Sequence, residues 1–144
     1  MTKHIVLGSD HGGYELKEFL KQQLSALDSL SIDDMGTFSK DSVDYPDIAD
    51  IVVKKVKETN GIGILCCGTG IGISIRANRH KGIRAAVVYD EFTAEMAKKH
   101  NNANILCLGG RTTPNENALS CVQTWLSHEF EGDRHLLRVD KLDN

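Results

Sequence analysis

Residues 61–72 read GIGILCCGTGIG, and this stretch decides the fold. Its first part, GIGILCC, is an unbroken apolar run of strand length, which is typical of a strand with both faces covered. Its second part has glycine at Gly68, Gly70 and Gly72 and leads into the sequence ISIRAN. A buried strand followed by a glycine-rich turn and a helix is the repeating unit of a parallel α/β sheet.

Strand-like and helix-like segments alternate along the rest of the chain. Four further strands are predicted from short apolar runs, at residues 4–9, 30–36, 83–89 and 104–110. Helices are predicted from apolar residues spaced three and four apart, at residues 14–27, near Pro46, 93–101 and 116–130. Like 61–67, the last two strand runs are continuously apolar, which predicts cover on both faces. The pattern predicts one α/β domain over residues 1–144, with α/β/α layers and a five-stranded, mostly parallel sheet.

Composition excludes several classes of protein. The chain of 144 residues is 40% hydrophobic and 26% charged, with a net charge of −3, so nucleic acid and anionic membranes are not expected as partners. It has no apolar run of bilayer length, and MTKHIVLGSD lacks the apolar segment of a secretory signal, so we expect a cytoplasmic protein with reduced thiols. Cys66, Cys107 and Cys121 are expected to be buried. No cysteine or histidine spacing indicates a zinc site, and no metal is expected.

The glycine-rich turn is not a known nucleotide motif. CGTGIG is neither a complete GxGxxG fingerprint nor a P-loop, so glycine spacing leaves both an anion-binding loop and a plain tight turn open. Cys67 favours a reactive role for this turn, because amide groups at the start of a helix stabilise a thiolate that could act as base or nucleophile. Adjacent strand residues point to opposite faces, so Cys66 should pack in the core and the pair should not form a redox dithiol.

Other polar residues gather where ligands bind in such sheets, or could equally be structural. Asp10 and His11 follow the first strand, where Asp10 could simply cap a helix. His100 and Asn101 lie at a helix end, where a histidine is often only a favourable cap. In the tail over residues 130–144, Arg134 and Arg138 share one face of a helical turn and could bind a phosphate together with His135, or could belong to a solvated tail.

Taken together, these segments resemble the ribose-5-phosphate isomerase B family, within the wider group of galactose- and allose-6-phosphate isomerases. The resemblance is carried in order by GSDHGGYELKE, DYPDIA, CGTGIGISI, GIRAA, HNNANILCLGGR and GDRHLLRV, over nearly the whole chain. It implies a Rossmann-like domain that dimerises, sometimes into tetramers, with active sites at the subunit interface. It also implies cofactor-free interconversion of ribose 5-phosphate and ribulose 5-phosphate through an enediolate, a reaction of the pentose phosphate pathway.

The resemblance also implies roles for individual residues. Cys67 matches the base that removes the substrate proton, and His100 matches the acid that assists ring opening. Asp10 and His11 match groups near the ring oxygen and the sugar hydroxyls. The positions that match binders of the developing oxyanion are Gly68, Thr69, Gly70, Ile71, Gly72 and Asn101. The positions that match binders of the substrate and its phosphate are Arg111, Arg134 and Arg138, some of them across the dimer.

The chain departs from the family pattern at a few positions. Ile73 stands where one branch has a glutamate base, which assigns this chain to the cysteine branch. Arg76 stands where a small residue is common, and Asp133 replaces a frequent glycine beside Arg134. The role of Tyr45 in the DYP motif is left open. These departures bear on substrate affinity and the geometry of the tail rather than on the reaction type.

Three alternatives stay open from the sequence. A sister isomerase acting on allose 6-phosphate or galactose 6-phosphate would use the same chemistry with a longer pocket. A non-catalytic sugar-phosphate-binding module would use the glycine loop but would not need Cys67 and His100 together. A thiol redox protein is disfavoured because no CxxC motif is present.

Overall fold

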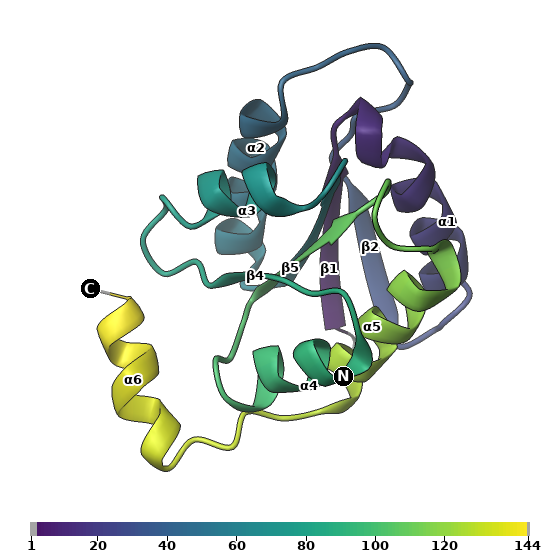
Figure 1. Cartoon of the computed structure of the whole chain (residues 1–144). Helices are drawn as coiled ribbons and strands as arrows, with labels where there is room; N and C mark the ends of the chain where they lie inside the picture. The colour runs from purple at the N-terminus through teal and green to yellow at the C-terminus, as the bar shows by residue number, and fades with distance from the viewer. Residues whose placement is uncertain (1–2, 144) are drawn as a thin grey trace.

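The apolar run after Gly61 forms β3, the central strand of a five-stranded sheet in this computed structural model, which describes residues 3–143 (Figure 1). All strands are parallel, in the order β2-β1-β3-β5-β4. The strands are β1 Lys3–Ser9, β2 Leu30–Asp34, β3 Ile62–Cys67, β4 Ala85–Val87 and β5 Ile105–Gly109. The helices are η1 His11–Gly13, α1 Tyr14–Ser25, α2 Tyr45–Thr59, α3 Ile71–Ala77, α4 Glu91–Lys99, α5 Asn115–Ser127 and α6 Arg134–Leu142.

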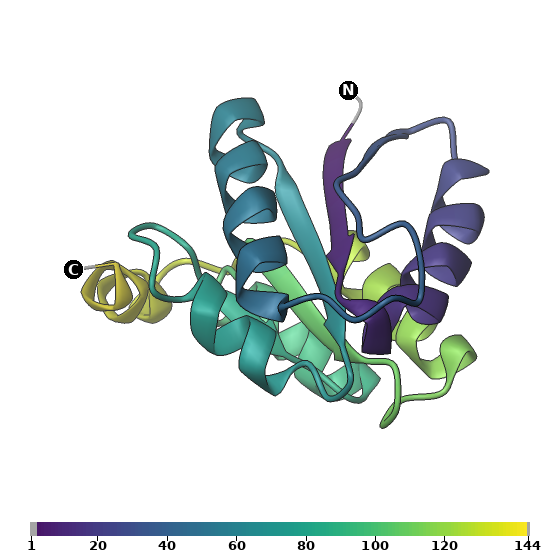
Figure 2. The same cartoon turned by 90° about the horizontal axis from the view of Figure 1, so that it is seen from above.

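Helices cover both faces of the sheet, as the continuous apolar strands require. On one face, α1, α4 and α5 pack over a core that contains Leu20, Leu106 and the fully buried Trp125. On the other face, α2 and α3 pack over a core that contains Val52 and Ile73. Figure 2 shows the two helical layers on either side of the sheet. The predicted three-layer α/β/α fold and its parallel sheet are therefore confirmed.

The register of the central strands brings three loops together. Ser9 of β1 lies opposite Cys66, and Cys67 lies opposite Gly109 at the end of β5. The loops that follow β1, β3 and β5 therefore leave the sheet at the same carboxyl edge, where ligands bind in open parallel sheets.

A buried ion pair joins the first helix to the second strand. Lys17 of α1 is 1% exposed, and its Nζ donates to both carboxylate oxygens of Asp34 at 2.7 and 2.8 Å. Lys21 adds a third bond to the same carboxylate at 3.0 Å. Burial opposes ionisation of Asp34, but its bonds to Lys17, the Gly36 amide and Lys21 outweigh that effect and lower its pKa. The pair links α1 to the end of β2.

Two predictions about the chain's second half need correction. The run at 83–89 forms only the three-residue strand β4, and its residues are half-buried because β4 lies at the edge of the sheet. The tail over residues 130–144, where no helix was predicted beyond the turn that holds Arg134 and Arg138, contains the helix α6. Only His135 and Val139 of α6 are buried, and the helix projects from the body of the domain (Figure 1). Across residues 3–143, no helix has both the length and the apolar character needed to cross a bilayer.

Candidate active site

Cys67 ends β3, and the turn that follows it places a backbone donor on its thiol. The Gly70 N–H donates to Cys67 Sγ at 3.0 Å, in a site where Cys67 is only 5% exposed. Gly70 adopts φ +82°, and a Cβ there would lie 3.1–3.2 Å from the backbone of Leu108, so glycine is required twice over. Ile71 N–H donates to Thr69 Oγ1 at 3.2 Å and begins α3. This geometry stabilises negative charge on sulfur.

Cys66 and Cys67 face opposite sides of the sheet, as expected from strand alternation. Cys66 packs in the core beneath α1 and α5, whereas Cys67 lies on the side of α2 and α3. Burial raises the pKa of the Cys66 and Cys107 thiols, and burial together with nearby acidic groups raises that of Cys121 to about 11. All four cysteines are free thiols, and the three predicted to be structural are buried.

Asp10, His11 and Arg111 surround the Cys67 loop. Asp10 caps η1, because its Oδ1 accepts a hydrogen bond from Gly13 N–H at 3.1 Å. His11 Nδ1 accepts from Val43 N–H at 3.2 Å, which leaves Nε2 as the donor of the neutral ring. The Arg111 guanidinium lies over the loop, since a Cβ at Gly68 would be 3.2 Å from its Nη1.

Two further contacts close the loop around Cys67. Gly110 N–H donates to the Cys67 carbonyl at 2.8 Å, and Arg111 N–H donates to the Gly68 carbonyl at 2.9 Å, which tie the loops after β3 and β5 together. The Tyr45 ring packs against Gly72, where a Cβ would lie 2.6 Å from its Cζ. Tyr45 therefore closes the first turn of α3 from the side of α2.

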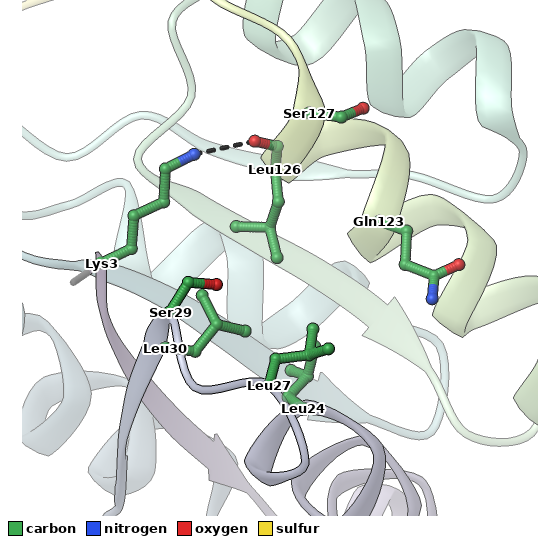
Figure 3. A pocket seen from close by; sticks show the side chains of 8 residues that line it. All are labelled: Lys3, Leu24, Leu27, Ser29, Leu30, Gln123, Leu126 and Ser127. Atoms are coloured by element: carbon green, nitrogen blue, oxygen red, sulfur yellow. Dashed lines mark hydrogen bonds between the residues drawn. The ribbon is translucent and has the colours of Figure 1, made fainter. Parts of the chain in front are cut away.

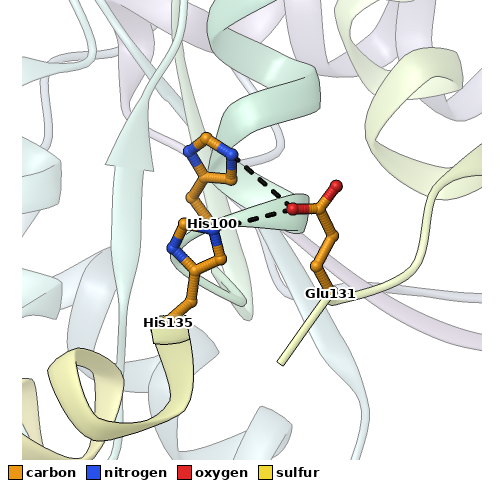
Figure 4. Close-up of side chains that lie close together, drawn as sticks. All are labelled: His100, Glu131 and His135. Atoms are coloured by element: carbon orange, nitrogen blue, oxygen red, sulfur yellow. Dashed lines mark ion pairs between the residues drawn. The ribbon is translucent and has the colours of Figure 1, made fainter. Parts of the chain in front are cut away.

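The other predicted residues form a second group at the end of α4 and the start of α6. His100 is the C-cap of α4, and its ring stacks on that of His135 with centroids 4.1 Å apart and planes at 17° (Figure 4). Glu131 Oε1 lies 3.8 Å from His100 Nε2 and 3.6 Å from His135 Nε2. Three further predicted residues are close in sequence to His100 or His135, and all are exposed: Asn101, Arg134 and Arg138.

The two groups lie at opposite edges of the sheet. Cys67 is level with Gly109, the last residue of β5, while His100 precedes the first residue of that strand. The first and last residues of β5 lie about 13 Å apart, at about 3.3 Å per residue. Figure 1 shows the end of α4 and the whole of α6 on the side away from the strand arrowheads. One copy of the chain does not bring His100 to Cys67.

The cavities with measurable volume are not centred on Cys67. A groove of about 260 Å³ lies where β1 starts and is lined largely by leucines, with Lys3 Nζ donating to the Leu126 carbonyl at 2.8 Å across it (Figure 3). Another cavity, of about 330 Å³, is lined by Arg84, Asn101 and Leu142 among others, beside α6. Cys67 is 5% exposed and does not line either of these cavities.

Sequence reasoning missed Glu131. Glu131 lies before the start of α6 and shares no helical turn with His135, so the sequence carried no periodic signal for it. Its backbone N–H donates to the Lys99 carbonyl at 3.1 Å, so the segment before α6 is attached beside His100.

Comparison with known proteins gives consistent matches over the whole chain. A family model described as Ribose/Galactose Isomerase matches residues 5–142. A putative sugar phosphate isomerase from Rickettsia bellii is 47% identical, with 99% of each chain covered. The crystal structure of a ribose 5-phosphate isomerase from Thermotoga maritima matches with a TM-score of 0.95 at 46% identity, covering 99% of both chains. The Mycoplasma genitalium ribose-5-phosphate isomerase B with bound ribulose-5-phosphate matches with a TM-score of 0.93 at 40% identity, covering 99% of this chain and 95% of that one.

Proposed function

This chain belongs to the ribose/galactose isomerase family, and we propose that it performs its isomerisation with Cys67 as the base and His100 as the acid. It is an isomerase that interconverts ribose 5-phosphate and ribulose 5-phosphate. The observation that carries the proposal is the Cys67 thiol at the carboxyl edge of the sheet, with the Gly70 N–H 3.0 Å from its sulfur.

The reaction needs only proton movements within the sugar. The ring opens when an acid protonates the ring oxygen, which frees the C1 aldehyde and acidifies the C2 hydrogen. The Cys67 thiolate removes the C2 proton, and the electron pair forms an enediolate. The proton then returns to C1, while the proton of the C2 hydroxyl passes to the oxygen on C1. C1 is thereby reduced and C2 oxidised inside one molecule, so the step balances without an external oxidant or reductant.

The loop residues suit the charge that forms during this reaction. Donors placed where negative charge develops are each worth up to ~3–4 kcal/mol of barrier. The Gly70 N–H already serves the Cys67 sulfur, so enediolate stabilisation is assigned to the remaining first-turn amides of α3 and to Asn101. Arg111, Arg134 and Arg138 supply the positive charge for the phosphate, which provides binding energy remote from the reacting carbons.

We assign the complete active site to two copies of the chain. A separation of about 13 Å along β5 is longer than a five-carbon sugar phosphate, so Cys67 and His100 of one chain cannot contact the same molecule. A two-fold dimer solves this problem, because it can pair the Cys67 group of each copy with the His100 group of the other. Each dimer then has two equivalent composite sites.

Exposed apolar side chains support this assembly. On α3, Ile71 and Ile75 are 56% and 54% exposed, close in the chain to the Cys67 loop. On α6, Leu136 and Leu137 are 52% and 63% exposed. A helix that projects from its own domain with leucines in solvent is suited to packing on a second copy. In the proposed dimer, α6 carries Arg134 and Arg138 to the partner's Cys67 loop.

Activity assays test the proposal directly. We expect the protein to isomerise ribose 5-phosphate in a coupled assay, and Cys67→Ala to lose nearly all turnover while still binding substrate. Cys66→Ala is the matched control, because it removes an adjacent thiol on the opposite face of the sheet and should retain catalysis. Full activity of Cys67→Ala would overturn the base assignment. Faster turnover of allose 6-phosphate than of ribose 5-phosphate would move the substrate assignment to the six-carbon sugars.

A further inference from the structure

The cluster of His100, Glu131 and His135 has the composition of a transition-metal site. One ligand atom from each residue lies within 4.8 Å of the other two. Two imidazoles and one carboxylate are ligands that suit Zn²⁺ and its neighbours in the first transition row. The three side chains come from two segments that are already attached to each other, because Glu131 N–H donates to the Lys99 carbonyl beside His100.

The three groups face one another without forming hydrogen bonds. Glu131 Oε1 is 3.6 Å from His135 Nε2 and 3.8 Å from His100 Nε2, both too long for a hydrogen bond (Figure 4). His135 is 6% exposed, and its Nε2 is buried with no hydrogen-bond partner among the described residues. A buried, unpartnered imidazole nitrogen normally costs free energy, so its orientation toward a carboxylate and a second imidazole needs an occupant.

The distances allow one ion to reach all three side chains, but the ligand atoms do not yet point at a common centre. The rings of His100 and His135 are stacked with their planes at 17°, and an imidazole binds a metal in its own ring plane. One ring must therefore turn out of the stack before both nitrogens form bonds of about 2.0–2.2 Å. His100 and Glu131 can make this adjustment, because their side chains are 37% and 42% exposed.

The charges nearby act in both directions. Burial, and then the neighbouring His100 and Arg134 side chains, lower the pKa of His135 and so favour its neutral ring. Arg134 and Arg138 also repel a divalent cation and weaken its binding. With three protein ligands, the fourth coordination position is open to water or to another ligand.

We propose that His100, Glu131 and His135 bind a divalent transition-metal ion such as Zn²⁺. The binding itself does not depend on the reaction assigned above. Its consequence does rest on the proposed function, because a metal on His100 removes the lone pair and proton that ring opening requires. The bound ion would then inhibit the isomerase, and the composite site would become sensitive to free zinc.

Calorimetric titration of the full-length protein with Zn²⁺ tests the site. We expect one ion per chain, with affinity lowered more than tenfold in both Glu131→Gln and His135→Asn. The Glu131 side chain is exposed, so its substitution keeps the fold. His128→Asn is the matched control, since His128 Nε2 pairs with Glu95 Oε1 at 2.9 Å elsewhere on the surface, and it should bind Zn²⁺ like the parent protein.

The outcomes separate this proposal from the reaction. Absence of saturable binding, equal binding in Glu131→Gln and His135→Asn, or loss of binding in Cys67→Ser alone would each overturn the metal site. Inhibition of ribose 5-phosphate turnover by Zn²⁺ that disappears in Glu131→Gln would support it. Zinc binding that depends on Glu131 but leaves turnover unchanged would support the metal site and overturn His100 as the acid.

Discussion

Mixing two inactive variants distinguishes a composite active site from one built within a single chain. Cys67→Ala removes the base and keeps His100, whereas His100→Ala removes the acid and keeps Cys67. If the two groups act across a dimer, each mixed dimer contains one site with both substitutions and one site with neither. Random exchange of subunits makes about half of the dimers mixed, so an equimolar mixture should recover about a quarter of the parent activity.

The expected recovery of activity depends on the separation of Cys67 and His100 in one chain. Because the length of β5, about 13 Å from its first to its last residue, lies between them, a chain acting alone has no complete site in either variant. The variants are purified separately, mixed, allowed to exchange and assayed with ribose 5-phosphate, and native mass spectrometry measures the fraction of mixed dimers. Cys67→Ala mixed with Cys67→Ser is the control, because no combination of these chains restores a thiol. No recovery of activity in a sample with the expected mixed dimers would refute the composite site.

Three further predictions concern the elements that hold the site. Gly70→Ala should lower the free energy of unfolding in urea by at least ~1 kcal/mol, because Gly70 has a φ of +82°. The kcat/KM of this variant should also fall, because the backbone donor to Cys67 shifts. A variant as stable and as active as the parent would contradict this prediction. Lys17→Ala should cost ~3–5 kcal/mol by leaving Asp34 buried and less well paired, and a loss below 1 kcal/mol would show that Lys21 alone suffices. Bonds from Arg76, and then from His80, lower the pKa of Asp50 to about 2. The Asp50 bonds therefore stabilise the fold above about pH 4, and this stabilisation is lost as the pH falls through about 2. The difference in Tm between the parent and Asp50→Asn should shrink over that range, and a constant difference would contradict the assignment.

The sequence was sufficient to predict the sheet and the edge at which the Cys67 loop lies. Strand β3 is apolar throughout because helices cover both of its faces. This pattern can be recognised from the sequence of the strand alone. The glycines that follow it are required by a left-handed conformation at Gly70 and by the Tyr45 ring against Gly72, so their spacing carried real information about the turn. Strand alternation also predicted correctly that Cys66 and Cys67 point apart.

The placement of the second group could not be predicted from the chain's own periodicity. The family resemblance implies that His100 and Cys67 belong to one site. In one chain, however, Cys67 lies level with the last residue of β5, and His100 precedes the first residue of that strand. Helix α6 could not be predicted either. Only His135 and Val139 of this helix are buried against its own domain, so its sequence has no continuous apolar face. Edge strand β4 looked internal because its residues are apolar, although only β5 pairs with it among the described strands.

The departures from the family pattern can now be placed. Arg76 forms a two-pronged pair with Asp50 through Nε at 2.8 Å and Nη2 at 2.9 Å, and His80 Nε2 contacts the same carboxylate at 2.7 Å. These bonds fasten the last turn of α3 to α2. Arg76 therefore adds a contact between the two helices that a small residue could not make. Asp133 differs, because it directly precedes Arg134 with φ +52° and no side-chain bond that caps α6. A non-glycine residue in that conformation stores strain at the joint from which α6 projects, so Asp133→Gly should relieve it and raise Tm by a few degrees. An unchanged or lower Tm in Asp133→Gly would show that the joint is not strained.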